Sequence, residues 1–325
     1  MSASISAGRP LANLSRYGLI LALIAVFSIF SAAAPTFLTP GNLQSILVNN
    51  FTLLAIVSIA MTFAVSAGGI DLSVGTAVDF ASFAFVSLVL AGKPVVLALL
   101  AALLAGAVVG AFNAILISAI GVSPFLATLG TLFIGRSIQQ LLTNGGNPVY
   151  LPPTGVPDAF RFLGHGTIAG FPVPLLIAAA VIAGAAILFS FTRFGRVVLS
   201  IGIQPSVVRY SGIGLGRHVA VTFILAGTVA AIAGIILTST VTVYIPSSGN
   251  AFLLNAIGAT FIGTTFSPLG RPNVAGTVFG VLLLSIVANG LLLTGLNFYW
   301  QQVGTGSLIF AVLAFSFINR KAAGT

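Results

Sequence analysis

The chain has 325 residues, of which 58% are hydrophobic and only 5% are charged. A soluble domain carries roughly a quarter charged residues, so we expect most of this surface to face lipid rather than water. The chain contains no cysteine, which excludes disulfides, thiolate metal sites and a cysteine nucleophile. Both histidines, His165 and His218, fall in hydrophilic breaks, so no metal site is expected.

Apolar segments follow one another along the chain, and each is close to the roughly 20 residues that a helix needs to cross a bilayer. Turn residues and charges divide them. The first segment follows two arginines as a signal peptide does, but Pro35 and the equally apolar chain beyond it favour a retained helix. The pattern predicts an all-α, polytopic membrane protein with ten spans at 17–34, 44–66, 72–91, 95–118, 124–142, 172–191, 219–241, 251–267, 273–294 and 299–318.

The net charge of +9 would suggest a nucleic-acid partner for a soluble protein. Here the basic residues lie mostly between apolar segments, so we expect lipid and no nucleic acid as surroundings. Positive residues concentrate in the cytoplasmic loops of membrane proteins. With both termini in the cytoplasm, Lys93 and Arg161 lie outside and Arg136 within a span, while nine lie inside: Arg9, Arg16, Arg193, Arg196, Arg209, Arg217, Arg271, Arg320 and Lys321.

A glycine pattern recurs in the fourth and ninth spans. The first copy is Gly106, Gly110, Gly121 and Gly130-Thr131, and the second is Gly276, Gly280, Gly295 and Gly304-Thr305. The two spans run in opposite directions in the expected topology, which predicts a five-plus-five inverted repeat of the kind found in transporters. The alternative is chance, because the chain has 37 glycines and GxxxG recurs wherever helices pack closely.

The break between the second and third spans reads Ala67-Gly68-Gly69-Ile70-Asp71-Leu72-Ser73-Val74-Gly75. Two adjacent glycines interrupt the helix, and the Asp71 carboxylate can then cap the next one, where the helix dipole favours a negative charge. One interpretation is a capped re-entry with a purely structural role. The other is a broken helix that lines the solute pathway or moves during transport.

Several further strings follow in order: Met61-Thr62-Phe63, 121–130, Gly135-Arg136, Thr143-Asn144-Gly145, 192–196 and Ser211-Gly212-Ile213. Together with 67–75 they resemble the membrane permeases of ribose-type ABC importers, the branch that also carries xylose, arabinose, galactose and autoinducer-2. The resemblance covers most of the chain. It implies one permease domain over residues 1–325, in a bacterial inner membrane.

The resemblance also implies partners. These are a second permease copy or a paralogous permease, two cytoplasmic ATP-binding subunits or one fused ATPase, and an external sugar-binding protein. The chain has no Gly-x-x-x-x-Gly-Lys-Ser/Thr phosphate loop, so we expect no ATPase site or cofactor in this subunit, with ATP and Mg²⁺ held by the partner. We therefore expect an importer permease for a monosaccharide or related small polar solute, and not an enzyme. The alternative is an ion-coupled secondary carrier; the cargo stays open.

The segment 193–217 is the expected coupling site for the ATPase. Four arginines favour a cytoplasmic location, and a short helix with an apolar face could dock into a groove of the partner. The alternative is a basic loop that only sets topology. The resemblance favours docking, although Gln204-Pro205-Ser206 departs from the family pattern; the candidate coupling residues are Arg193, Arg196, Gln204, Val208, Arg209, Tyr210 and Ile213.

Ionisable residues within spans are costly and usually face a partner or a wet cavity. Asp79, where the family usually has a small apolar residue, could pair with Arg136 or with polar groups near the pathway, or it could simply be protonated or hydrated. Asn113 and Thr128 could face the centre or bond between helices. The candidate pathway and gating residues are Gly68, Gly69, Asp71, Asp79, Asn113, Phe125, Thr128 and Arg136, with Phe125 implied by the resemblance alone.

The clearest departure from the family pattern lies at 253–264. Leu253 and Asn255 stand where relatives are acidic, and Thr264 replaces the second of two glycines. Pairing with a more typical permease in a heterodimer would explain these changes, and so would divergence toward a different solute.

Overall fold

The structure is a computed structural model that describes residues 8–152, 154–267 and 270–322. Within them, each of the ten predicted spans coincides with a long helical segment, which confirms the all-α polytopic fold. These segments are α1 (Gly8–Ala33), α2 (Pro40–Ser45) continued by the π-helix η1 (Ile46–Phe51) and α3 (Thr52–Ser66), α4 (Val74–Leu90), α5 (Val95–Ala114) continued by η2 (Ile115–Ile120), α6 (Pro124–Leu142), α8 (Val173–Phe191), α11 (Leu215–Val241), α12 (Asn250–Thr264), α13 (Val274–Leu293) and α14 (Phe298–Ala322).

The connections contain further short elements. Helices α9 (Arg193–Ile203) and α10 (Pro205–Tyr210) lie in the segment 193–217, where a short helix was expected. The sequence patterns did not predict α7 (Asp158–His165) or the four two-residue strands. Strand β1 (Val149–Tyr150) pairs antiparallel with β4 (Val243–Tyr244), with Val149 opposite Tyr244. Strand β2 (Thr167–Ile168) pairs with β3 (Phe171–Pro172).

Five of the helical segments in the described chain are long and apolar enough to cross a membrane, and three others are apolar but shorter. The long ones are Pro40–Ser66, Val95–Ile120, Val173–Phe191, Leu215–Val241 and Val274–Leu293. Helix α6 is not among them. It carries Arg136, Ser137 and Gln140 on exposed positions, and these polar side chains lower its mean hydropathy.

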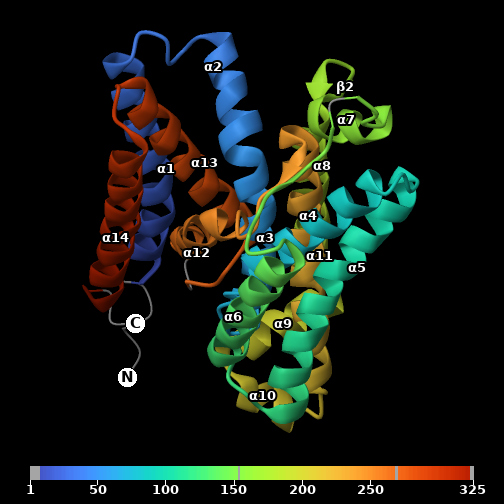
Figure 1. Ribbon diagram of the computed structural model, residues 1–325. Coiled ribbons are helices and arrows are strands. Elements are labelled where there is room, and N and C mark those ends of the chain that lie inside the picture. Colours follow the sequence, from blue (N-terminus) through green and yellow to red (C-terminus); the bar gives the residue numbers. More distant parts are fainter. Residues whose placement is uncertain (1–7, 153, 268–269, 323–325) are drawn as a thin grey trace, which may run out of the picture. The chain divides into compact units, whose positions relative to one another are not determined.

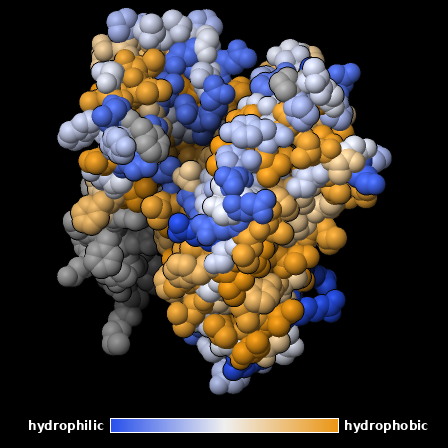
Figure 2. All heavy atoms as spheres, viewed as in Figure 1, coloured by the Kyte–Doolittle hydropathy of each residue, from blue (hydrophilic) through white to orange (hydrophobic). Residues whose placement is uncertain are grey.

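The chain divides into two compact units, residues 52–256 and residues 1–51 with 257–325. In unit 2 (residues 52–256), α11 is the central helix and packs against α3, α4 and α5; Figure 1 shows α4, α5 and α11 side by side. Phe85 of α4 stacks on Phe160 of α7 with ring centroids 5.0 Å apart. The visible face of this unit is largely hydrophobic over α5 (Figure 2), where Leu100 and Leu104 are among the exposed side chains, as expected for contact with lipid.

The loops of unit 2 form two groups, and the loop-to-loop contacts described below lie within one group or the other. In one group, β1 pairs with β4 and His165 Nε2 lies 3.0 Å from the Thr240 carbonyl oxygen. In the other, a Cβ added to Gly68 would lie 3.3 Å from Gly202, and one added to Gly69 would lie 2.5 Å from Pro124. Helices that alternate in direction across a membrane require this separation into two ends.

Unit 1 (residues 1–51 and 257–325) is built around α13, which packs against α1, α14 and η1. Phe30 and Phe37 pack on Ile286 and Val287 in its core. The amides of Asn42 and Asn289 bond reciprocally, at 3.1 and 3.0 Å. A paired amide leaves fewer polar atoms unsatisfied among apolar helices. The single permease domain expected from the sequence stays a prediction.

Three of the four glycine pairs of the expected repeat have matching environments in their two halves, whereas a Cβ at Gly304 would meet Leu291 and one at Gly130 would meet nothing within 4 Å. A side chain at Gly106 or Gly110 would strike the backbone of α11, and one at Gly276 or Gly280 would strike the backbone of α12. Further along, Gly121 and Gly295 both have positive φ, 87° and 81°, a conformation that favours glycine. These shared roles support the internal repeat, while the inverted relation of the halves stays a prediction.

The contact between α5 and α11 provides a test of this packing. Replacing Gly227 by leucine would push a side chain into the Gly106 carbonyl oxygen, and overpacking of this kind typically costs about 1–3 kcal/mol. We expect a clear drop in the melting temperature of the purified protein. Gly184→Leu on α8 is the matched control, because nothing lies within 4 Å of a Cβ there. Equal melting temperatures for the two variants would contradict the predicted close contact.

Candidate functional site

The break between α3 and α4 is held by a buried polar network. Asp71 Oδ1 accepts hydrogen bonds from the Ser73 backbone N–H at 2.8 Å and from the Ser73 hydroxyl at 2.6 Å. Asp71 therefore stabilises the turn that leads into α4. It does not cap the helix itself as we predicted, because Ser73 is the N-cap residue.

This network continues into α5 and α6. The Asn113 amide donates to Ser73 Oγ at 2.6 Å, and the Thr131 hydroxyl donates to Asn113 Oδ1 at 2.5 Å. Asn113 is fully buried and Thr131 nearly so. Of the two interpretations that the sequence left open for Asn113, the structure favours bonding between segments: its amide ties α5 to α6 and to the break.

Thr128 and Gly69 attach the same break to α6. Thr128 Oγ1 accepts a hydrogen bond from the Leu72 N–H at 3.0 Å and donates to the Pro124 carbonyl oxygen at 2.9 Å. Gly69 leaves no room for a side chain beside Pro124. Gly68 has φ 86°, a backbone conformation that the turn requires and that favours glycine. Gly69 is needed for a different reason, the close approach of the break to Pro124. Both glycines and Thr128 are explained by packing, and their role in gating stays a prediction.

Asp79 does not pair with Arg136, and this predicted pairing is wrong. Asp79 Oδ1 accepts hydrogen bonds from the Gly249 N–H at 2.7 Å and the Ser248 hydroxyl at 3.1 Å. Both donors lie in the connector before α12, residues 242–249. Asp79 is fully buried, and the positive end of the α12 dipole faces its carboxylate. The alternative that Asp79 bonds to polar groups is the one that the structure confirms.

Arg136 lies on an exposed position of α6 and forms no hydrogen bond or ion pair with the part of the chain that the structure describes. Phe125, half exposed, and Phe133 lie on the same open side of this helix. An arginine at this depth does not remain in hydrocarbon, because its charge needs water or a protein partner. The open face of α6 is therefore directed toward water or other protein.

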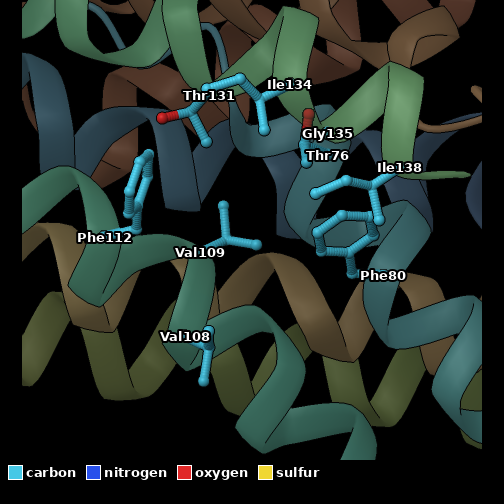
Figure 3. Close-up of a pocket in the computed structure, with 9 residues that line it drawn as sticks. All are labelled: Thr76, Phe80, Val108, Val109, Phe112, Thr131, Ile134, Gly135 and Ile138. Atoms are coloured by element: carbon cyan, nitrogen blue, oxygen red, sulfur yellow. The ribbon is translucent and has the colours of Figure 1, made fainter.

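An apolar cavity of about 200 Å³ lies between α4, α5 and α6 (Figure 3). Its polar side chains are Thr76 and Thr131, and the Thr131 hydroxyl already donates to Asn113. A sugar needs several convergent donors and acceptors, so this cavity does not have the composition of a sugar site. The other lining residues are Phe80, Val108, Val109, Phe112, Ile134, Gly135 and Ile138.

The predicted coupling segment forms α9 and α10, and its residues divide into two groups. Val208 is buried and packs with Ile201, Val219 and Phe223, so it seats α10 on the bundle and offers no docking surface. Tyr210 is 90% exposed and Val207 is 53% exposed. The other candidates, Arg193, Arg196, Gln204, Arg209 and Ile213, are also exposed, and their docking role stays a prediction.

The sequence analysis missed the connector as part of the site. Gln139 Oε1 accepts hydrogen bonds from the Ser247 N–H at 2.8 Å and from the Tyr244 hydroxyl at 3.2 Å. Gln139 is a polar residue within an apolar span, and that signal could have identified it.

Two of the three departures from the family pattern near α12 can be related to their surroundings. Leu253 is buried, and the Thr264 hydroxyl donates to the Phe261 carbonyl oxygen. Nothing in the structure explains Asn255.

The family model described as "Branched-chain amino acid transport system / permease component" matches residues 43–313. A ribose import permease protein of Escherichia coli (strain K12) is 32% identical over 87% of this chain and 88% of its own length. Its Bacillus subtilis (strain 168) counterpart is 33% identical over 91% of both chains. A D-allose transport system permease protein of E. coli K12 is 32% identical over 92% of this chain and 90% of its own. No solved structure matches the chain.

The Asn113 bridge can be tested with a double-mutant cycle. Asn113→Ala and Thr131→Val each remove the bond between α5 and α6, so the second change should cost little once the first is made. We expect a coupling of about 0.5–2 kcal/mol in unfolding measured in detergent micelles. Ser82→Ala with Thr131→Val is the control pair, because Ser82 bonds elsewhere, to the Gly234 carbonyl oxygen. Additive losses for Asn113 and Thr131 would contradict the bridge.

Asp79 and Arg136 should act independently. They have no hydrogen-bond partner in common in the described chain, so the stability losses of Asp79→Ala and Arg136→Ala should add to within about 0.5 kcal/mol. The Asp79 variant should be the more destabilised, because it leaves the connector donors unpaired. A loss in the double variant that is smaller than the sum of the two single losses by more than about 1 kcal/mol would restore the pairing predicted from the sequence.

Proposed function

The chain belongs to the family described as branched-chain amino acid transport system / permease component, and we propose that it is the membrane-spanning subunit of an ATP-driven, binding-protein-dependent importer. The observation that carries this proposal is the similarity to sugar import permeases over about nine-tenths of the chain. The helical fold agrees with it, since five of the described helices are long and apolar enough to cross a membrane and three shorter ones are also apolar. The ATPase that supplies energy is a separate subunit.

The proposed cargo is a monosaccharide or a related small polar solute. The named relatives are permeases for ribose and D-allose, whereas the family description names branched-chain amino acids. The sugar relatives are 32% or 33% identical to this chain over about nine-tenths of its length, which favours a sugar. A panel of pentoses, hexoses and branched-chain amino acids presented with the binding protein distinguishes the two classes.

We place the protein in a bacterial inner membrane with both termini in the cytoplasm. Nine basic residues then lie inside and two outside. The separation of the unit 2 loops into two ends fits this orientation: α9 and α10 lie at the end of the break 67–73, and the β1–β4 pair lies at the other. The coupling segment is then cytoplasmic, and residues 143–172 face the binding protein.

Docking of the ATPase on α9 and α10 explains an otherwise unusual surface. Tyr210, Val207 and Ile203 expose large apolar side chains next to Arg209. Apolar and aromatic side chains beside an arginine are typical of protein interfaces. Two cytoplasmic ATP-binding subunits, or one fused ATPase, are the partners proposed for this surface.

The open face of α6 is the proposed contact with the solute path or with a second permease subunit. It combines Arg136, Ser137 and Gln140 with Phe125 and Phe133. This mixture is unsuited to lipid, because buried charge in hydrocarbon is costly. Either a second copy of this chain or a paralogous permease would complete the path.

The proposal is tested by reconstitution. The chain is co-expressed with a candidate ATPase and a candidate sugar-binding protein from the same organism, purified as a complex and placed in lipid discs. Hydrolysis of ATP that the loaded binding protein stimulates supports the importer. If no ATPase associates and an ion gradient alone drives uptake into vesicles, a secondary carrier replaces this proposal.

The coupling surface yields a specific prediction. Tyr210→Ala with Val207→Ala should weaken ATPase association and lower binding-protein-stimulated hydrolysis at least about tenfold, because aromatic anchors commonly contribute 2 kcal/mol or more at interfaces. Leu100→Ala is the matched control, since Leu100 is also largely exposed but lies on the lipid face of α5. Full association of the α10 double variant would rule out docking at this surface.

A further inference from the structure

The connector between α11 and α12 descends along α4. Tyr244 lies beside Phe83, with ring centroids 5.3 Å apart. Ser248 and Gly249 bond to Asp79, one turn further down α4. Gly249 finally packs against Gly75, another turn down. At a rise of 1.5 Å per residue, the connector thus follows α4 for about 12 Å and ends about 22 Å from the Leu90 end of that helix.

The connector is irregular backbone at a depth where lipid surrounds the protein. Such backbone is tolerated in a membrane only where it is buried in protein or lines a water-filled cavity. One side of the connector is buried in protein. There, Asp79 accepts a hydrogen bond from the Gly249 N–H and Gln139 accepts one from the Ser247 N–H. The other side does not pack against unit 2: Ile245 is 48% exposed, and Pro246, Ser247 and Ser248 are partly exposed.

We propose that residues 245–248 line the aqueous path of the solute and that Asp79 and Gln139 are the positioning residues that hold them there. The inference rests on the proposed importer function. The path at this level offers the Ser247 hydroxyl and backbone carbonyl oxygens beside the apolar side chains of Ile245 and Pro246, while the Ser248 hydroxyl is bonded to Asp79. The carboxylate of Asp79 is fully buried and directed at the start of α12, so it presents no charge to the solute.

This chemistry fits a neutral, polyhydroxylated solute. Hydroxyl groups and peptide groups exchange hydrogen bonds with sugar hydroxyls as water does, and they bind them weakly enough to release them. An ion would need a formal charge or a ring of oxygens at this point. The bond to the connector explains the presence of a carboxylate in this span: without it, the N–H of Gly249 would be unsatisfied at mid-membrane.

Cysteine labelling tests the inference directly, since the native chain has no cysteine. Ser247→Cys, in the complex with ATPase and binding protein in lipid discs, is treated with a charged methanethiosulfonate that does not enter lipid. The control is Leu104→Cys, 64% exposed on the lipid face of α5 and at a similar depth. Thiols react as thiolates, which hydrocarbon disfavours, so we expect Ser247→Cys to react at least about tenfold faster.

Two further variants keep the test decisive. If Ser247→Cys is not recovered from membranes, Ile245→Cys takes its place, with the same expectation. Adding Asp79→Leu should change the labelling rate of the connector cysteine several-fold, whereas Asp79→Asn, which keeps an acceptor oxygen, should change it much less. Labelling no faster than at Leu104 overturns the lining role, and equal rates with Asp79→Leu overturn the positioning role.

The same discs separate this inference from the proposed function. Stimulated ATP hydrolysis with an unreactive connector cysteine overturns the inference and leaves the importer standing. A reactive cysteine in a complex whose ATPase does not respond to the binding protein leaves the aqueous connector standing and removes the importer.

Discussion

Hydrocarbon offers no hydrogen-bond partners, so every peptide group within the membrane must find one inside the protein. Helices meet this requirement by themselves, and ten of them form most of the described chain. The requirement becomes demanding at the two places where unit 2 leaves helical geometry, the break 67–73 and the connector 242–249. Each is stabilised by a buried carboxylate and a buried amide: Asp71 with Asn113, and Asp79 with Gln139. The scarcity of acidic residues makes this use of two carboxylates conspicuous, since the whole chain has only three.

Close backbone contact is the second means by which the units hold together. Apolar side chains gain little from leaving lipid for a protein interior, so helices in membranes associate through small residues that allow close approach. Gly106 and Gly110 meet α11 in this way, and Gly276 and Gly280 meet α12. The hydrogen-bonded side chains then fix the register, because Asn113 can bridge Ser73 and Thr131 in only one alignment of α5 and α6.

Sequence reasoning recovered the spans because hydropathy and charge report directly on the bilayer. It also identified the glycine pairs, because in membranes a glycine without a side chain commonly allows two helix backbones to approach closely. It failed where a residue's partner is remote in sequence: Asp79 is 170 residues from Gly249, and nothing local distinguishes that donor from Arg136. Val208 was misassigned to a surface because a six-residue helix, α10, is too short for periodicity to fix its buried side. The connector looked like an ordinary loop, since its depth follows only from its neighbours on α4.

The contact between Gly68 and Gly202 joins α9 to the start of the break that Asp71 stabilises. Backbone meets backbone there, with 3.3 Å from a Cβ built on Gly68 to Gly202 Cα. A side chain at such a contact can rotate and absorb a displacement, whereas two glycines have no torsions beyond the backbone with which to do so. The α9 backbone therefore lies directly on the turn beside Asp71, with no side chain between them. A displacement of α9 would have to move this turn or open the contact, so the break is the part of the buried network that is nearest to the helices of the proposed coupling segment.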